Sequence, residues 1–111
     1  MSTLVAAAMH SSIAVAVDHP SFAGHFPKFP VLPGAVLLDE ILQIIERDRR
    51  IDLAQWQIAS AKFLDAVRPG DVLDLEHSAP SSGLIRFTVR APDRTVASGS
   101  LARAAHPGGA A

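Results

Sequence analysis

A histidine and a carboxylate stand fourteen positions apart in a stretch of the sequence that is otherwise almost entirely apolar. The stretch, GHFPKFPVLPGAVLLDE, places His25 in a loop rich in proline and phenylalanine and Asp39 in the helical run that follows. Side chains of both types exchange protons, as general acid–base chemistry requires. Each also has a structural interpretation: a histidine bonded to loop backbone, and an aspartate on a solvated helix face.

The surroundings of Asp39 favour a proton donor. Ala35 and Val36 occupy the preceding turn on the same side of the predicted helix, so the local environment is expected to be apolar. Apolar surroundings favour the neutral carboxyl, which can donate a proton at pH 7. Asp39 also shares a stripe with Gln43 and Glu46, a pattern that is equally typical of a solvated face.

The start of the same helix is a second candidate for chemistry. Pro33 and Gly34 begin it, and no Ser, Thr, Asp or Asn stands at the capping position. The first-turn N–H groups therefore lack a local acceptor, and the helix dipole adds partial positive charge there. Either water or a loop carbonyl satisfies these groups, or they are left open for a ligand oxygen as an oxyanion-type donor site.

Composition narrows the remaining possibilities. The chain has 111 residues, 49% of them hydrophobic, and a formal net charge of −1, which predicts one folded domain and does not suggest nucleic-acid binding. Without cysteine there is no disulfide, thiolate metal site or cysteine nucleophile. No His, Asp and Glu set has the spacing of a metal site. No apolar run approaches the ~20 residues of a membrane span, and we expect a cytoplasmic protein.

The elements that must position these groups follow from periodicity. A helix is predicted from Ala35 to about Arg50, and period-two strands are predicted at Trp56–Leu64, Val72–His77, Leu84–Arg90 and Thr95–Arg103. Leu4–Met9 and Ile13–Val17 are expected to pair as a hairpin around a turn at residues 10–12. The connections RPGD, PSSG and PDR suit antiparallel neighbours.

One helix that is apolar over more than half its circumference must be wrapped, and only the strands are available to wrap it. The sequence therefore predicts an α+β domain over residues 1–105, a curved antiparallel sheet around one central helix, with a disordered tail at 106–111.

Two segments carry a family resemblance. The run FAGHFPKFPVLPGAVLLDEILQ (22–43) resembles the signature of the hotdog-fold 3-hydroxyacyl-acyl-carrier-protein dehydratases: GHFP, P-x-x-PG, an acidic residue fourteen after the histidine and a glutamine four later. The positions in register are His25, Pro27, Pro30, Pro33, Gly34, Asp39 and Gln43. The run KFLDAVRPGDVL (62–73) is similar to the family's KF…PGD strand and turn.

The resemblance implies a hotdog fold and dehydration of a 3-hydroxyacyl thioester, carried by acyl carrier protein, to the trans-2-enoyl thioester. It implies His25 as the base, Asp39 as the acid, a thioester carbonyl held by the Gly34 N–H, and Gln43 orienting the Asp39 carboxyl. No cofactor or metal is implied. The family's histidine and acid meet across a dimer interface, so a homodimer is expected. Candidate walls of an acyl tunnel are Phe22, Phe26, Phe29, Leu32, Pro33 and Val36.

Two positions depart from the usual pattern. Lys28 stands where the family usually has glycine, and Asp39 replaces glutamate, as in the branch of the 3-hydroxydecanoyl-type dehydratase/isomerases and the short aryl-polyene-cluster dehydratases. Two other functions stay open: a hotdog thioesterase, and a non-catalytic acyl-binding subunit, for which an intact His25–Asp39 pair would be unnecessary. Acyl chain length, isomerisation and a sister subunit in place of the homodimer are also open.

Overall fold

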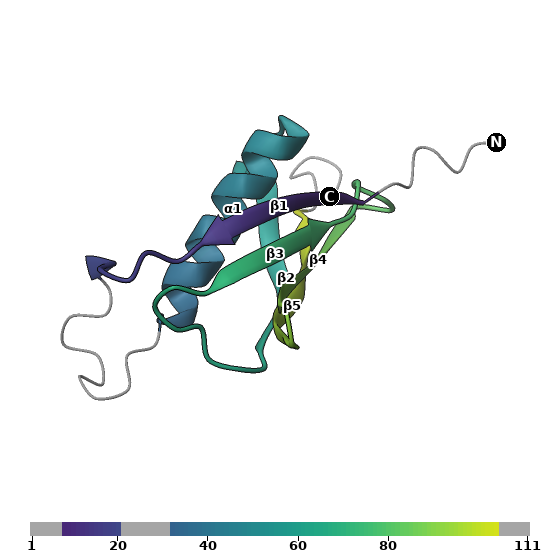
Figure 1. Ribbon diagram of the computed structural model, residues 1–111. Coiled ribbons are helices and arrows are strands. Elements are labelled where there is room, and N and C mark those ends of the chain that lie inside the picture. Colours follow the sequence, from purple (N-terminus) through teal and green to yellow (C-terminus); the bar gives the residue numbers. More distant parts are fainter. Residues whose placement is uncertain (1–7, 21–31, 105–111) are drawn as a thin grey trace.

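A curved five-stranded antiparallel sheet packs against one long helix in the computed structural model, which describes residues 8–20 and 32–104 (Figure 1). The elements in chain order are β1 (Met9–Ala14), α1 (Gly34–Arg49), a 3₁₀ turn (Leu53–Gln55), β2 (Trp56–Phe63), β3 (Val72–His77), β4 (Leu84–Ala91) and β5 (Arg94–Arg103). The strand order is β1-β3-β4-β5-β2. The predicted α+β class, the helix and the four strands predicted after it are confirmed. The predicted tail at 106–111 lies outside the described residues, and a single domain over 1–105 stays a prediction.

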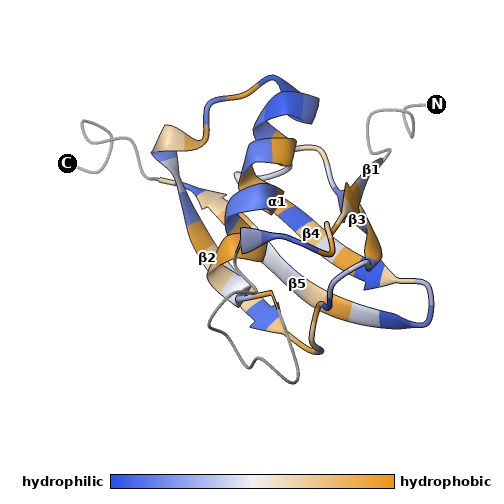
Figure 2. Cartoon of the chain, turned by 60° about the vertical axis from the view of Figure 1, so that its left-hand side comes forward, coloured by the Kyte–Doolittle hydropathy of each residue, from blue (hydrophilic) through white to orange (hydrophobic). Residues whose placement is uncertain are grey.

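The core lies between α1 and the concave face of the sheet. Leu37, Ile41 and Ile45 form the buried stripe of the helix, one turn apart, as its apolar periodicity requires. In β4 the predicted alternation is confirmed, because the odd-numbered residues Ile85 to Val89 are buried and the even-numbered ones are more exposed. Figure 2 shows these alternating hydrophobic and hydrophilic bands along helix and strands. In the described part of the chain, no helix has the length and apolar character needed to cross a membrane.

The predicted turn at residues 10–12 is wrong. These residues lie inside β1, where His10 pairs with Glu76 and Ser12 with Asp74 of β3. β1 is an edge strand, so its polar side chains can face solvent while Ile13 is buried, and the imidazole of His10 contacts Asp74 at 2.9 Å. Most of the first predicted hairpin strand, Leu4–Met9, lies outside the described residues.

The RPGD segment was expected to connect neighbouring antiparallel strands, but the strands that it connects are not neighbours. It forms a local turn, with Asp71 accepting from the Arg68 N–H at 2.9 Å, but β2 and β3 are separated in the sheet by β4 and β5. Residues 64–71 are therefore a crossover. Arg94 fixes this crossover to the start of β5, since its guanidinium bonds the Ala66 carbonyl at 2.9 Å and Asp71 at 3.1 Å.

A buried histidine network fastens the C-terminal turn of α1 to the sheet. His77 of β3 is completely buried, and its Nδ1 accepts from Arg49 Nε at 3.1 Å. Arginine can only donate, so Nε2 carries the proton and donates to Asp48 at 3.0 Å. Ser11 of β1 donates to the same Asp48 carboxylate. Three elements thus meet at Asp48.

The environment of the Asp48 carboxyl should make the stability of the fold sensitive to acid. Burial by itself would raise the pKa of Asp48, but hydrogen bonds from Ser11, His77 and Arg47 outweigh it and hold the pKa below its ordinary value. A lowered native pKa stabilises the fold above about pH 5, and this contribution is lost as the pH falls below about 4. Asp48→Asn is expected to cost about 1–2 kcal/mol of unfolding free energy near pH 7. In urea titrations across pH, the gap from wild type should shrink below pH 4; a gap that stayed constant would contradict the prediction.

Candidate active site

Among the described residues, the start of α1 has no side-chain cap. Pro33 takes the capping position with φ −58° and ψ 141°, and no side chain caps the helix. Its carbonyl accepts from the N–H groups of Val36 and Leu37, at 3.0 and 3.1 Å. The uncapped start predicted from the sequence is confirmed within the described part of the chain. The N–H of Gly34 lies in the first turn, where the helix dipole favours an electron-rich oxygen.

The segment before the helix is held by the crossover. The N–H of Leu32 donates to the carbonyl of Val67 at 2.7 Å, and both side chains are buried in the core. Because Arg94 bonds the neighbouring Ala66 carbonyl, a chain of contacts runs from β5 through the crossover to the helix start. Of the predicted tunnel walls, Leu32 therefore belongs to the core, while Pro33 and Val36 are half-buried.

Gly34 faces an aromatic ring that the sequence reasoning did not include in the site. A methyl group at Gly34 would lie 3.1 Å from the ring of Phe63, the last residue of β2. Phe63 is half exposed. Phe63 belongs to the KF…PGD segment, and that segment was the signal that could have identified it.

Asp39 and Gln43 form the polar part of the site. The Gln43 amide donates to the Asp39 carboxylate at 2.8 Å across one helical turn, which is the orienting contact expected of this pair. Both side chains are exposed in the single chain. The apolar surroundings predicted for Asp39 are therefore wrong for one chain on its own, because Asp39 lies on the outer side of α1, away from the sheet.

Four predicted site residues cannot be placed. His25, Phe22, Phe26 and Phe29 lie outside the described residues, as does Lys28. Their assignments stay predictions.

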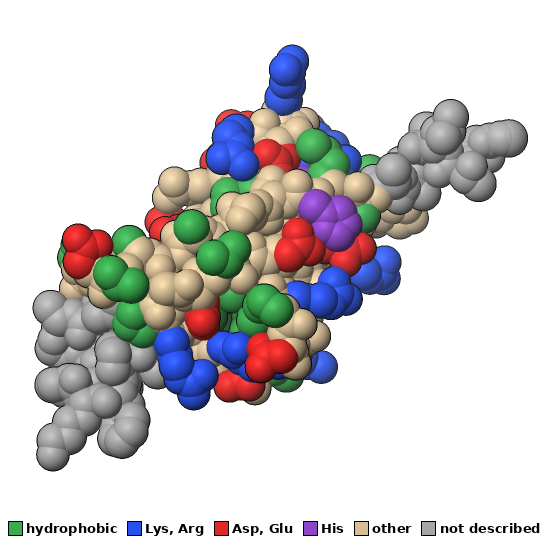
Figure 3. Space-filling view, viewed as in Figure 1, with side chains coloured by type: hydrophobic (Ala, Val, Ile, Leu, Met, Phe, Trp, Pro, Cys, Tyr) green, Lys and Arg blue, Asp and Glu red, His purple; other side chains and the backbone are tan. Residues whose placement is uncertain are grey.

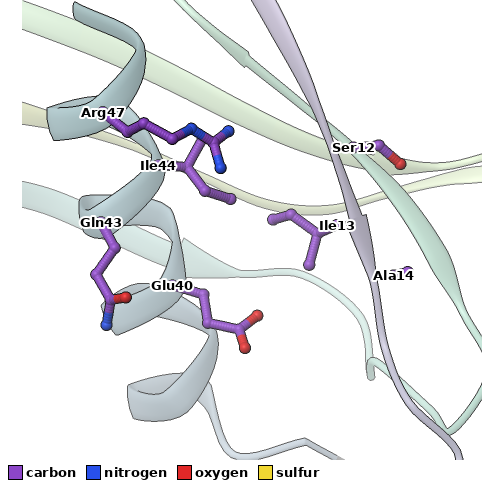
Figure 4. Close-up of a pocket in the computed structure, with 7 residues that line it drawn as sticks. All are labelled: Ser12, Ile13, Ala14, Glu40, Gln43, Ile44 and Arg47. Carbon is purple, nitrogen blue, oxygen red and sulfur yellow. The ribbon is translucent and has the colours of Figure 1, made fainter. Parts of the chain in front are cut away.

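A hollow lies between α1 and β1. It has a volume of about 500 Å³ and separates α1 from β1, with Glu40, Ile44 and Arg47 extending from the helix toward Ile13 (Figure 4). Gln43 borders this hollow as well as contacting Asp39. Neither Gly34 nor Asp39 lines it, so it is separate from the proposed proton-transfer groups.

The outer edge of β2 is open. β2 pairs with β5 along one side, and in the described single chain no strand pairs with its other side. Large apolar side chains are exposed on it and just beyond it: Ile58 (47%), Phe63 (50%) and Leu64 (57%). Figure 3 shows a face on which acidic, basic and hydrophobic side chains are interspersed. An edge with unpaired backbone groups and apolar side chains is a surface suited to pairing with another chain.

Comparison with known proteins is decisive for the family. The model of the ApeI-like family, described as ApeI dehydratase, matches residues 4–100. The chain belongs to the ApeI-like dehydratase family.

Relatives of this ApeI-like protein include 3-hydroxyacyl-[acyl-carrier-protein] dehydratases FabZ. That of Chlamydia caviae is 41% identical over 55% of this chain and 46% of its own length. That of Lactobacillus helveticus is 31% identical over 78% of this chain and 66% of its own length. The chain spans about half the length of the first of these relatives.

Solved structures similar to the ApeI-like chain share its fold. A chain of the dehydratase heterocomplex ApeI:P from Xenorhabdus doucetiae matches with a TM-score of 0.72 and 22% identity, covering 88% of each chain. A hot-dog-like protein from Thermanaerovibrio acidaminovorans matches with a TM-score of 0.63 and 14% identity, covering 94% of this chain and 87% of that one. The predicted hotdog fold is confirmed.

Proposed function

We propose that this chain dehydrates a 3-hydroxyacyl thioester, carried on acyl carrier protein, to the trans-2-enoyl thioester. The observation that carries the proposal is the Asp39–Gln43 contact, in a helix whose start has no side-chain cap and in a chain of the ApeI-like dehydratase family. An elimination of this type needs a base for the α-proton, donors for the thioester oxygen and an acid for the leaving hydroxyl. The named residues offer one group for each need.

The proposed steps balance without a cofactor. The imidazole of His25 takes the α-proton, and the electron pair moves toward the thioester carbonyl, whose oxygen the Gly34 N–H stabilises. As the α,β double bond forms, the C–O bond to the β-hydroxyl breaks, and Asp39 supplies the proton that lets it leave as water. Gln43 keeps the Asp39 carboxyl in orientation. A positioned proton-transfer group typically contributes ~10²–10⁴-fold, and an oxyanion donor about 10²–10³-fold.

The working unit is proposed to be a dimer. The open edge of β2 and its exposed apolar side chains support association, and the exposure of Asp39 supports a site that a second subunit completes. A partner there would provide the apolar surroundings that Asp39 lacks in one chain, and would bring the His25 of the other subunit. The similar ApeI:P structure is a heterocomplex, so a sister hotdog subunit is the alternative to a homodimer.

The proposed substrate also implies a partner protein and a cellular location. Acyl carrier protein is acidic, and Lys62 and Arg68 are exposed cations that could attract it. No metal or nucleic acid is required by the chemistry. We place the reaction in the cytoplasm, where the sequence led us to expect the protein.

Product analysis tests the function directly. The purified protein is incubated with a 3-hydroxyacyl thioester on acyl carrier protein, while enoyl absorbance and free thiol are followed together. We expect enoyl formation without thiol release, and its loss in His25→Ala. Thiol release without enoyl product would instead identify a thioesterase, and binding without either product a non-catalytic subunit.

A further inference from the structure

The crossover at residues 64–71 adjoins the helix start on two sides. It begins directly after Phe63, whose ring lies against Gly34. On the other side, the N–H of Leu32, just before the helix, donates to the carbonyl of Val67 at 2.7 Å. The position of the Gly34 N–H therefore depends on what holds the crossover in place.

The crossover is also bonded to the chain that leaves β1. The N–H of Val15 donates to the backbone carbonyl of Asp71 at 2.9 Å, and the carbonyl of Val15 accepts from the N–H of Gly70 at 2.8 Å. The chain is thus bonded to the crossover both before and after residues 21–31, the part of the sequence that contains the predicted base His25.

One guanidinium holds the crossover to the sheet. Arg94 is the first residue of β5, and its Nη2 donates to the Ala66 carbonyl at 2.9 Å and to the Asp71 carboxylate at 3.1 Å. Its Nη1 donates to Asp93 at 3.0 Å, and its Nε lies 3.3 Å from the Asp65 carboxylate. The planar fork of arginine thus contacts both ends of the crossover, a geometry that the point charge of a lysine does not reproduce.

Three carboxylates share this one cation. Among the described residues, the ion pairs of Asp65, Asp71 and Asp93 are all made with Arg94. Without the guanidinium, like charges would lie close together at the crossover and repel one another. Removal of Arg94 would therefore loosen the crossover twice, through the lost hydrogen bonds and through the uncompensated charge.

We propose that Arg94 is a positioning residue for the dehydration: it fixes the crossover, and the crossover fixes the Gly34 N–H. This inference rests on the proposed function, which assigns that N–H to the thioester carbonyl oxygen. The effect of Arg94 passes through Ala66 and Val67 to Leu32 and not through the substrate. Because a misplacement of about 1 Å can cost about 10²-fold in rate, loss of this anchor should lower kcat rather than weaken substrate binding.

Amide hydrogen exchange tests the anchor without any catalysis. Arg94→Met replaces the side chain by one of similar shape that has neither charge nor donors. In NMR exchange measurements on the full-length protein, the Leu32 and Val15 amides should then exchange about tenfold faster or more, because charge-assisted hydrogen bonds that hold their acceptors are lost. Amides of β4, in the middle of the sheet, should change less. Unchanged exchange at both Leu32 and Val15 would overturn the proposal.

Kinetic constants test the positioning role. With a 3-hydroxyacyl thioester on acyl carrier protein, and at a temperature at which the variant is folded, Arg94→Met should lower kcat about 10²-fold and leave KM largely unchanged. Arg94→Lys keeps the charge without the fork and should recover only part of kcat. Arg90→Met is the matched control, since Arg90 bonds Glu76 at 2.8 Å on neighbouring strands, and should keep both constants. Wild-type kcat in Arg94→Met, or an equal loss in Arg90→Met, would overturn the proposal.

The two measurements separate this inference from the proposed function. Faster exchange at Leu32 in a protein that forms no enoyl product would keep the anchor and refute the proposed reaction. Enoyl formation with the same kcat in wild type and Arg94→Met would keep the reaction and remove Arg94 from it. If Arg94→Met fails to fold, Asp71→Asn removes the charge of one partner and keeps an oxygen acceptor, so kcat should fall and Leu32 should exchange faster. Wild-type values of both in Asp71→Asn would overturn the proposal.

Discussion

Asp39→Asn is expected to lower kcat/KM for dehydration by about 10²–10⁴-fold, because the amide cannot supply the proton that the leaving hydroxyl needs. Stability should be unaffected, since the side chain is exposed and the new one is nearly isosteric. Gln43→Ala should cause a smaller loss, because it removes the 2.8 Å orienting contact and keeps the carboxyl. Enoyl absorbance under substrate-limiting conditions, with thermal unfolding in parallel, measures both effects.

Glu40→Gln is the matched control for this loss. Glu40 adjoins Asp39 in sequence but lines the hollow beside β1, so its neutralisation should leave turnover close to wild type. Near-wild-type activity in Asp39→Asn, or an equal loss in Glu40→Gln, would remove Asp39 from the mechanism.

The Asp39→Asn variant also tests how the subunits are arranged. If His25 and Asp39 of one site come from different subunits, mixing His25→Ala with Asp39→Asn protein creates mixed dimers with one intact site. Random exchange should then restore about a quarter of wild-type activity. No recovery after verified exchange would indicate that each site is built within one chain.

Gly99→Ala is expected to destabilise the fold by about 3 kcal/mol or more, the upper range for overpacking a close-packed site. A methyl at Gly99 would clash with the backbone oxygen of Ser60 and would lie 2.6 Å from the ring of Phe87. The ring is buried and the Ser60 oxygen is backbone, so neither moves cheaply. The strain falls on the pairing of β5 with β2, and β2 carries the Phe63 that faces the helix start. Urea unfolding and dehydration assays should both show the loss.

Ser98→Ala provides the comparison for this effect. Ser98 is the neighbour of Gly99 in β5 and pairs with Lys62 and Thr88 rather than facing the core. Its replacement should change the unfolding free energy by less than about 0.5 kcal/mol. A Gly99→Ala protein as stable as Ser98→Ala would mean that β2 can shift away from β5 without cost.

Local sequence was sufficient for α1, for the strands β2 to β5 and for part of the site. Period-two alternation located β4, apolar periodicity located α1, and the absence of a capping side chain before Gly34 predicted an open helix start. The spacing of four between Asp39 and Gln43 places them one turn apart, and the hydrogen bond between them follows from helix geometry alone. Each of these features depends on residues within a few positions of one another.

Tertiary structure decided the features that depend on partners distant in sequence. His10 to Ser12 have the composition of a turn, yet hydrogen bonding to β3 makes them strand. RPGD has turn residues, yet β2 pairs with β5 and the segment becomes a crossover. The sequence therefore determined the helix, the strands β2 to β5 and the candidate acid. Long-range backbone pairing and burial decided the order of the strands, the position of Phe63 against Gly34 and the exposure of Asp39 in one chain. Local sequence patterns do not encode these features.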